Sequence, residues 1–221
     1  PSPARDAARG AVRAFDLCRP AGLCQNVARW RRTEEPMFET TPIADLLVVR
    51  PRRHGDARGF FSEVWSRRAF EAEGLAHDWC QDNHSRSAEA GTLRGLHYQA
   101  PPMAQAKLVR CAAGRIWDVA VDMRPASPTF RRWYGIELSA ENWAQLLVPR
   151  GFLHGFLTLT PGAEVLYKVD APYSAVHDGA VAWDDPELAI DWPLSGPPVL
   201  AGKDRAAPRL ADWTNPFGGP T

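Results

Sequence analysis

The sequence predicts an all-β fold, a sandwich or barrel built from many short strands. Runs with the residue pattern of strands recur at fairly regular intervals from residue 43 onward, and turns rich in glycine and proline separate them. The chain holds 17 Gly and 20 Pro in 221 residues, a length suited to one domain with a substantial buried core. Few helical segments interrupt the pattern, so a double-sheet jelly roll is the architecture that fits best.

Individual strands are expected where apolar or alternating residues run between turn residues. These segments are Asp45–Pro51, Gly59–Trp65, Thr92–Gln99, Lys107–Cys111, Gly114–Asp122, Arg132–Leu138, Gln145–Pro149, Leu153–Thr160, Ala163–Val169 and Ala180–Trp183. One helix is expected at Ser66–Glu73, with Ser66 as its N-cap before a short periodic run. Gly114 and Gly151 supply the flexible positions of two tight turns, and the second turn delivers His154 to the start of the next strand.

The chain divides at Met37 into two parts of different composition. Residues 1–36 are rich in arginine and alanine, have weak periodicity and precede a methionine that leads into the first strand. We therefore expect residues 1–36 to be an N-terminal extension that is poorly ordered or not native to the fold, and residues 37–221 to form the jelly-roll domain. The alternative is an ordered N-terminal arm that packs on a partner subunit.

Composition and charge argue against several classes of protein. Lys plus Arg and Asp plus Glu both total 26, so no overall basic field exists to attract nucleic acid or anionic lipid. No apolar run approaches the roughly 20 residues that a membrane span requires. Cys18, Cys24, Cys80 and Cys111 lack the paired spacing and histidine partner of a zinc knuckle. No secretory signal is recognisable, so we expect a cytoplasmic protein with free thiols.

The segment Arg94–Gln99 gives the first indication of chemistry. It places His97 between an arginine and a strand-like run, and neutral imidazole can accept a proton near pH 7. The chain otherwise uses arginine for positive charge, and Lys107, Lys168 and Lys203 are its lysines. Where such a chain keeps a lysine, the compact ammonium charge can itself be required. These features suggest an enzyme that moves protons.

Further motifs follow one another in a fixed order between Met37 and about Leu210. They are Gly55–Glu63, Gln81–Ser85, Arg94–Gln99, Lys107–Arg110, Asp118–Asp122, Ser139–Asn142, Pro149–Phe156, Leu166–Lys168 and Trp183–Pro186. This series resembles the dTDP-4-dehydrorhamnose 3,5-epimerase family. The resemblance implies a cupin-like jelly roll, or double-stranded β-helix, with a few short helices. It also implies a homodimer that works without a cofactor or a metal ion.

The reaction implied by the resemblance is epimerisation of a dTDP-linked 4-keto-6-deoxy-hexose at C3, C5 or both. Removing a C–H next to the C4 ketone gives an enolate, and returning a proton to the opposite face inverts the carbon. These steps need a base on one face, an acid on the other and a fixed positive group at the oxygen. By the resemblance, His97 is the base and Asp204 orients it, Tyr167 is the acid, and Lys107 stabilises the enolate oxygen.

Each of these residues also has an ordinary structural interpretation. A lone histidine such as His97 is often buried and donates to a carbonyl group. A tyrosine such as Tyr167 within a strand is usually a core aromatic whose hydroxyl lies at the rim. Lys107 could be a surface lysine on an alternating strand. The surrounding motifs favour the catalytic interpretation, and for Lys107 the scarcity of lysine adds to it.

The nucleoside diphosphate of such a substrate needs forked arginines for its phosphate oxygens and an aromatic face for its base. The resemblance assigns to this end Arg58, Phe60, Glu63, Gln81, Asn83 and Arg94. Arg58 and Glu63 are expected to reach the site across a dimer interface; the alternative is an ordinary charge pair at a strand edge. His154 is expected to be a polar residue of the pocket near the sugar.

The sequence departs from the family pattern after the expected Tyr167 strand. Many members carry two consecutive aromatic residues there, whereas this chain has Pro172 before Tyr173. A proline cannot stack as a phenol does. The local packing around the nucleotide or the sugar is therefore open, and so is the question of whether both carbons are epimerised.

Three other functions are compatible with parts of the sequence. A metal-dependent cupin would place two histidines as H-x-H on one strand, whereas Leu96–Gln99 offers one histidine, although Pro149–His154 resembles a second metal motif. A non-catalytic sugar-nucleotide binder would be expected to lose His97, Tyr167 or Asp204, and all three are present. A sugar-nucleotide ketoisomerase shares the enolate chemistry and is the closest enzymatic competitor.

Overall fold

The computed structural model describes residues 37–218, and the structural statements below concern this part of the chain. Residues 1–36, predicted as an N-terminal extension, lie outside the described residues, as do residues 219–221, Cys18 and Cys24. Within the described part, Cys80 and Cys111 are free thiols.

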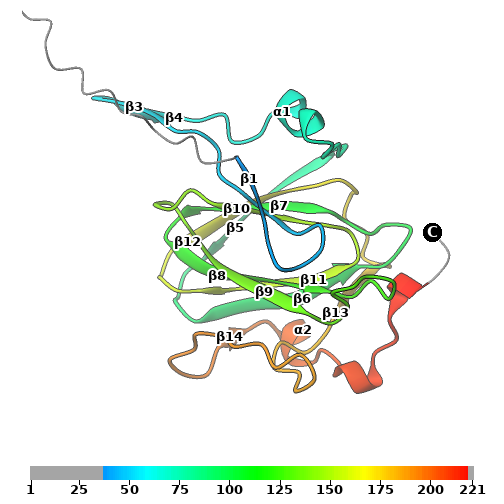
Figure 1. Cartoon of the computed structure of the whole chain (residues 1–221). Helices are drawn as coiled ribbons and strands as arrows, with labels where there is room; N and C mark the ends of the chain where they lie inside the picture. The colour runs from blue at the N-terminus through cyan, green and yellow to red at the C-terminus, as the bar shows by residue number, and fades with distance from the viewer. Residues whose placement is uncertain (1–36, 219–221) are drawn as a thin grey trace, which may run out of the picture. The chain divides into compact units, whose positions relative to one another are not determined.

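Strands account for most of the regular structure. They are β1 (Phe38–Thr40), β2 (Leu47–Val49), β3 (His54–Asp56), β4 (Gly59–Phe61), β5 (Gln81–Ser87), β6 (Thr92–Gln99), β7 (Lys107–Ala113), β8 (Arg115–Asp122), β9 (Trp133–Ser139), β10 (Gln145–Val148), β11 (Phe152–Thr158), β12 (Ala163–Val169), β13 (Asp178–Ala180) and β14 (Val199–Leu200). The first six-stranded sheet has the order β1-β2-β10-β7-β12-β5. The second has the order β13-β6-β11-β8-β9, with β14 beside β6. The two sheets face each other, and the β3-β4 hairpin extends away from them (Figure 1).

Two short α-helices and two turns of 3-10 helix complete the described fold. They are α1 (Arg67–Ala72), α2 (Gly202–Arg205), η1 (Leu210–Asp212) and η2 (Pro216–Gly218). Buried Phe70 packs α1 against Leu108 and Leu147 on the outer face of the first sheet. The C-terminal segment, orange to red in Figure 1, runs along the outer face of the second sheet, where Trp192 and Leu210 join its buried side chains.

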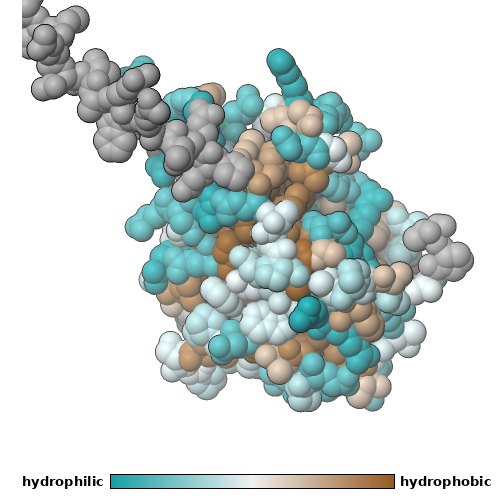
Figure 2. All heavy atoms as spheres, in the orientation of Figure 1, coloured by the Kyte–Doolittle hydropathy of each residue, from teal (hydrophilic) through white to brown (hydrophobic). Residues whose placement is uncertain are grey.

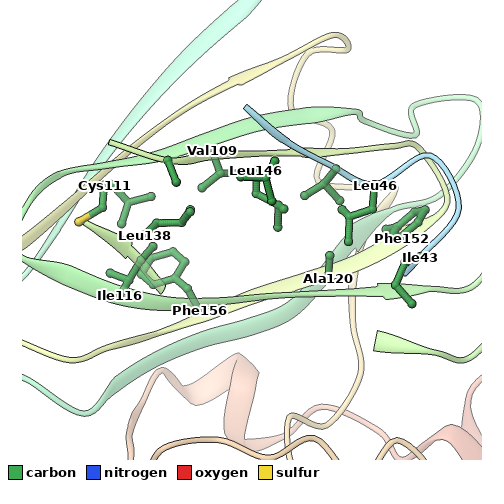
Figure 3. Packing of buried hydrophobic residues seen from close by; sticks show 14 of the residues in the cluster. Ile43, Leu46, Val109, Cys111, Ile116, Ala120, Leu138, Leu146, Phe152 and Phe156 are labelled. Carbon is green, nitrogen blue, oxygen red and sulfur yellow. The ribbon is translucent and has the colours of Figure 1, made fainter. Parts of the chain in front are cut away.

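The architecture confirms the predicted all-β jelly roll with a few short helices. Between the sheets, inward-facing residues of both form one apolar core, in which Val109, Leu146 and Leu46 face Ala120 and Phe156 (Figure 3). These side chains alternate along their strands with residues that face outward, as the period of two in a β-strand requires. Figure 3 shows the two rows pointing toward one another, so the core lies between the sheets.

Several predicted elements differ from the structure. The predicted strand Gly59–Trp65 is regular only over Gly59–Phe61, and the predicted strand Ala180–Trp183 is replaced by Asp178–Ala180. Ser66 precedes α1 as expected, but its side chain makes no capping hydrogen bond.

The sequence analysis missed β5 as a strand. Its sequence, QDNHSRS, contains no apolar residue, and Asp, Asn and Ser are uncommon in strands. Pairing with β12 along its full length, from Gln81 opposite Val169 to Ser87 opposite Ala163, overrides this weak local preference.

Two glycines bring β6 and β11 unusually close at the point where the register between them shifts, between His154 and Phe156. A Cβ atom on Gly155 would lie 2.9 Å from the carbonyl oxygen of Arg94, and one on Gly95 would lie 2.6 Å from Cα of Gly155. No side chain other than hydrogen fits both positions. This close contact sets the register in which His97 and His154 become direct partners across the two strands.

The surface of the described part is largely polar. Figure 2 shows hydrophilic side chains over most of one face, with smaller areas of apolar surface between them. Among the exposed large apolar residues, Phe60 and Phe61 stand on the β3-β4 hairpin, and Tyr173 follows β12. None of the helices in residues 37–218 is long and apolar enough to cross a membrane.

Gly155→Ala should destabilise the domain, because the added methyl group meets the backbone of β6. We expect the free energy of unfolding to fall by about 1–3 kcal/mol, the usual cost of overpacking. Denaturant unfolding of purified protein would measure this change. Gly196→Ala is the control, since a Cβ there meets nothing within 4 Å; its stability should be unchanged or higher by up to about 1 kcal/mol. Equal stability of the two variants would contradict the proposed role of the glycine contact.

Candidate active site

A polar pocket opens between the two sheets at one end of the jelly roll. Its walls come from β5, β6, β7, β12, β13 and α2 and from the segments that precede β7 and follow β12. The lining residues are Gln81, Asn83, His97, Tyr98, Gln99, Gln105, Lys107, Tyr167, Tyr173, Asp178 and Lys203. The pocket therefore brings together three of the four predicted catalytic residues, with the fourth, Asp204, bonded to His97.

His97 and Asp204 form a hydrogen-bonded pair although 107 positions separate them in sequence. His97 Nε2 lies 2.5 Å from Asp204 Oδ1. The imidazole of His97 is 25% exposed and faces the pocket, whereas the Asp204 carboxylate is only 2% exposed. The short helix α2 holds Asp204 behind the ring. A buried carboxylate in this position fixes the orientation of the imidazole and stabilises it when protonated.

Burial is the main influence on the charge of His97. It lowers the pKa of the imidazole below its usual 6.5, while the hydrogen bond and negative charge of Asp204 raise it, and the charges of Lys203 and Lys107 lower it. The net effect is a pKa below the usual value. His97 is consequently neutral, and able to accept a proton, over most of the physiological pH range.

Tyr167 faces His97 from the other sheet. Its ring packs against the apolar core from β12, and its hydroxyl makes no hydrogen bond with residues 37–218. Burial raises the pKa of the phenol, and the nearby positive charges of Arg94 and Lys203 act in the opposite direction. The hydroxyl is therefore protonated at neutral pH and free to donate to a bound molecule.

Lys107 stands on the same sheet as Tyr167, at the start of β7. Its ammonium makes no hydrogen bond or ion pair with the described residues. Burial lowers its pKa to about 8, and the charge of Asp118 is the largest influence in the opposite direction. A lysine in this state is still mostly charged at pH 7 and can neutralise a developing negative charge in the pocket.

His154, predicted as a polar residue of the pocket, is buried opposite His97 on the neighbouring strand and is not among the residues that line the pocket. Its Nε2 is 3.0 Å and 3.1 Å from the two carboxylate oxygens of Asp118, which is fully buried. The pair sits directly beside His97 in the strand register. Asp118 had no predicted role, and its inward position between core residues Ile116 and Ala120 is the signal that identifies it.

Three predicted binding residues lie in or near the pocket. Gln81 and Asn83 line it from β5, and Gln81 Nε2 donates to Asn83 Oδ1 at 2.8 Å. Arg94 is outside the lining, with Nε 3.2 Å from Ser87 Oγ, but its charge acts on Tyr167. The Arg94 guanidinium is thus close to the pocket but is not among the groups that line it.

The other three predicted binding residues do not reach this pocket within the chain. Arg58 and Phe60 stand on the β3-β4 hairpin, where Arg58 is paired with Asp56 and Phe60 packs edge-on against Trp143. Glu63 follows the hairpin and is exposed. The Arg58 side chain is 89% exposed, so its ion pair contributes little to stability.

The pocket also contains residues to which the sequence analysis gave no role. Tyr173 presents a 60% exposed ring at its mouth. Lys203 Nζ pairs with Asp178 at 2.9 Å, which links the start of α2 to β13. Gln99 and Gln105 contribute buried or half-buried amides. Within residues 37–218, no three His, Cys, Asp or Glu side chains come together in a way that could hold a metal ion.

Comparison with known proteins identifies the family. The family model described as dTDP-4-dehydrorhamnose 3,5-epimerase matches residues 40–212. Curated relatives of that name are 49% identical in Sinorhizobium fredii and 50% identical in Salmonella typhimurium. These matches cover 81% and 77% of this chain, and 92% and 93% of the relatives. The chain belongs to the dTDP-4-dehydrorhamnose 3,5-epimerase family.

Solved epimerase structures agree with this assignment. One from Bacillus anthracis, with TDP and PPi bound, is 52% identical, has a TM-score of 0.76 and covers 78% of this chain and 98% of its own. One from Legionella pneumophila, in complex with dTDP-4-keto-L-rhamnose, is 43% identical with a TM-score of 0.76, covering 79% and 93%. A 3'-monoepimerase from Streptomyces bikiniensis, in complex with dTDP-quinovose, is 34% identical with a TM-score of 0.73, covering 77% and 86%. The resemblance seen in the sequence is thus confirmed.

For this epimerase-family chain, Asp204→Asn should lower the pKa of His97 further. Asp204 raises that pKa through both its hydrogen bond and its charge, and asparagine removes the charge. NMR titration of the His97 ring would give the pKa in each protein. Asp184→Asn is the control, since this exposed carboxylate pairs with Arg209 and not with His97. An unchanged or higher His97 pKa in Asp204→Asn would contradict the electrostatic role of the carboxylate.

Proposed function

We propose that the protein is an isomerase that epimerises a dTDP-linked 4-keto-6-deoxy-hexose next to its ketone. The observation that carries the proposal is the His97–Asp204 pair, which shares one pocket with Tyr167 and Lys107 on the opposite sheet. Membership of the dTDP-4-dehydrorhamnose 3,5-epimerase family supports the same reaction. The Legionella pneumophila relative, crystallised with dTDP-4-keto-L-rhamnose, supports the substrate class.

In the proposed mechanism, His97 removes the acidic proton from a carbon next to the C4 ketone. The C–H electron pair moves into a C=C bond, and the carbonyl oxygen becomes an enolate. His97 is suited to this step because it is neutral at working pH, and Asp204 stabilises the imidazolium that forms. The ammonium of Lys107, which has no partner among the described residues, meets the enolate oxygen.

Inversion requires that the proton return from the opposite face of the sugar ring. Tyr167 is suited to this because it stands on the sheet that faces His97 and its hydroxyl is protonated and unbonded. The enolate carbon takes the phenolic proton, the ketone re-forms, and the phenolate gains a proton from solvent at the pocket mouth. All steps use side chains, so the proposal includes no cofactor.

The nucleotide end of the substrate is proposed to lie toward Gln81, Asn83 and Arg94. We further propose that Arg58, Phe60 and Glu63 complete this end from the partner subunit of a homodimer. The exposure of the β3-β4 hairpin supports this, since Phe60 and Phe61 are 53% and 70% exposed on an element that extends from the sheets. The free thiols of Cys80 and Cys111 fit our proposal that the enzyme acts in the cytoplasm.

Two further reactions remain alternatives to epimerisation at both carbons. A 3'-monoepimerase is among the solved relatives, so inversion at one carbon fits the same family. A ketoisomerase would use the same enolate but protonate its C4 oxygen to give an enediol. Loss of the C3 hydroxyl proton would then form a ketone at C3 while C4 takes a proton.

Incubation with dTDP-4-keto-6-deoxyglucose in D2O, followed by NMR, tests the proposal directly. We expect deuterium at C3, C5 or both with inverted configuration, because each proton removed is replaced from solvent. His97→Ala should reduce exchange at either carbon by about 10²–10⁴-fold, the usual contribution of a general base. Tyr167→Phe should slow product formation more than the initial loss of substrate proton.

Absence of exchange at both carbons in the wild-type protein would refute the epimerase proposal. Equal loss of exchange and product in Tyr167→Phe would contradict the separate roles of base and acid. A ketoisomerase product, recognised by migration of the ketone, would favour that alternative instead. A stoichiometric metal ion in the active protein, found by elemental analysis, would instead favour the function of a metal-dependent cupin.

The dependence of kcat/KM on pH should be bell-shaped. Activity rises through the His97 pKa, which lies below 6.5, because the base must be neutral, and falls above a pH of about 8, because Lys107 must be charged. Lys107→Ala should lower the maximum by about 10²–10³-fold and remove the fall near pH 8. Persistence of that fall in Lys107→Ala would assign it to another group.

A further inference from the structure

The segment that follows β12 forms a lip over the pocket. It runs from Ala171 to Ser174, and its Tyr173 side chain is exposed at the mouth of the pocket. The neighbouring Pro172 has no backbone N–H, so its peptide nitrogen cannot be tied down by a hydrogen bond. The position of the Tyr173 ring depends on what holds the peptide groups on either side of it.

The side chain of Gln99 forms hydrogen bonds with the backbone of the lip. Its Oε1 accepts a hydrogen bond from the Ser174 N–H at 2.7 Å, and its Nε2 donates to the Pro172 carbonyl at 3.1 Å. Nε2 also donates to the Met103 carbonyl at 2.7 Å, which ties the lip to the turn after β6. Both hydrogens of the amide are therefore used, and the side chain, with Gln99 only 5% exposed, has no freedom to turn.

These bonds fix the backbone of Tyr173 on both sides. The peptide group before Tyr173 is held at its carbonyl by Gln99 and at its N–H by Gln81 Oε1, at 3.1 Å. The peptide group after it is held at its N–H by Gln99. With both peptide planes fixed, the direction of the Cα–Cβ bond is fixed too, and only the side-chain rotamer remains.

Gln99 also belongs to the strand that carries the proposed base. It lies two residues after His97 on β6, so both side chains project from the same face of the strand. Its backbone partner is Asp178 of β13, which pairs with Lys203 next to Asp204. The spacing between His97 and the backbone of Tyr173 is therefore set through one strand.

We propose that Gln99 is a positioning residue that places the Tyr173 ring against the bound nucleotide sugar. The inference rests on the proposed function, because it supposes that a dTDP-sugar occupies this pocket. An aromatic face at the mouth adds affinity by stacking on a planar group or by covering the sugar. Gln99 acts on affinity and not on proton transfer, since none of its bonds reaches His97, Tyr167 or Lys107.

A double-mutant cycle tests this role. Gln99→Met keeps the length of the side chain but loses all three hydrogen bonds, and Tyr173→Ala removes the ring. We expect each single change to raise KM for dTDP-4-keto-6-deoxyglucose about 10-fold with kcat within about twofold, since stacking on one aromatic ring is worth about 1–3 kcal/mol. The double variant should show no larger KM than Tyr173→Ala, because Gln99 acts only through that ring.

A matched control separates positioning from general loss of stability. Thr158→Val removes two hydrogen bonds between a buried side chain and backbone, at 2.8 Å to the Glu89 carbonyl and 2.9 Å from the Thr92 N–H, at the far ends of β6 and β11. It should leave KM and kcat unchanged. The proposal would be overturned if the KM increases of the two single variants multiplied in the double variant. A fall in kcat at constant KM in Gln99→Met would also overturn it.

A second variant and a second probe keep the test independent of folding and of catalysis. Gln99→Glu retains the shape and the bond from Ser174 but places a carboxylate against two carbonyl groups, so it too should raise KM only when Tyr173 is present. The same cycle measured with dTDP itself by calorimetry does not need turnover. If the protein binds dTDP but exchanges no deuterium, the proposed function fails while the cycle still decides the role of Gln99. If the changes in dTDP binding free energy of the two single variants add in full in the double variant, the proposed role of Gln99 is refuted.

Discussion

The alternation of side chains along the strands is the constraint on which the site depends. Inward-facing positions near the middle of the domain carry Val109, Phe156 and their neighbours, which form the core between the sheets. The same faces carry Lys107 on β7 and His154 on β11 where the core gives way to the pocket. A shift of one residue in the pairing of a strand would turn its core residues and its pocket residues outward together. The packing energy of the core therefore also holds the polar groups of the pocket in place.

The pocket uses burial to set opposite properties in neighbouring groups. Removal from water lowers the pKa of both His97 and Lys107, because it disfavours their charged forms. Two buried carboxylates act against this effect, Asp204 on His97 and Asp118 on Lys107. Since the ordinary pKa values of the two groups lie far apart, the result is a neutral imidazole beside a charged ammonium near pH 7. This is the combination that the proposed proton abstraction requires.

Strand β6 connects most parts of the proposed mechanism. Its Arg94 acts on Tyr167, its His97 is the proposed base, and its Gln99 holds the lip that carries Tyr173. The close contact with β11 at Gly155 then fixes this strand against its neighbour. Binding and chemistry are thus coupled through a single rigid element, which is a more accurate support than a loop.

The sequence by itself determined the fold class, the family and five of the eleven residues that line the pocket. Strand spacing predicted the jelly roll, and the ordered motifs indicated His97, Tyr167 and Lys107, which the structure brings together. These signals are local, because each depends on a short run of residues and on alternation with a period of two. The polar strand β5 escaped prediction because its pairing with β12, and no apolar pattern of its own, makes it a strand.

Only the tertiary structure decided which distant groups meet. It placed the Asp204 carboxylate 2.5 Å from His97, paired buried His154 with buried Asp118, and left Arg58 on a hairpin outside the pocket lining. It also joined Gln99 to a lip more than 70 residues further along the chain. Such contacts cannot be obtained from local patterns, because they arise when two sheets close around a shared core and bring residues together without regard to their separation in sequence.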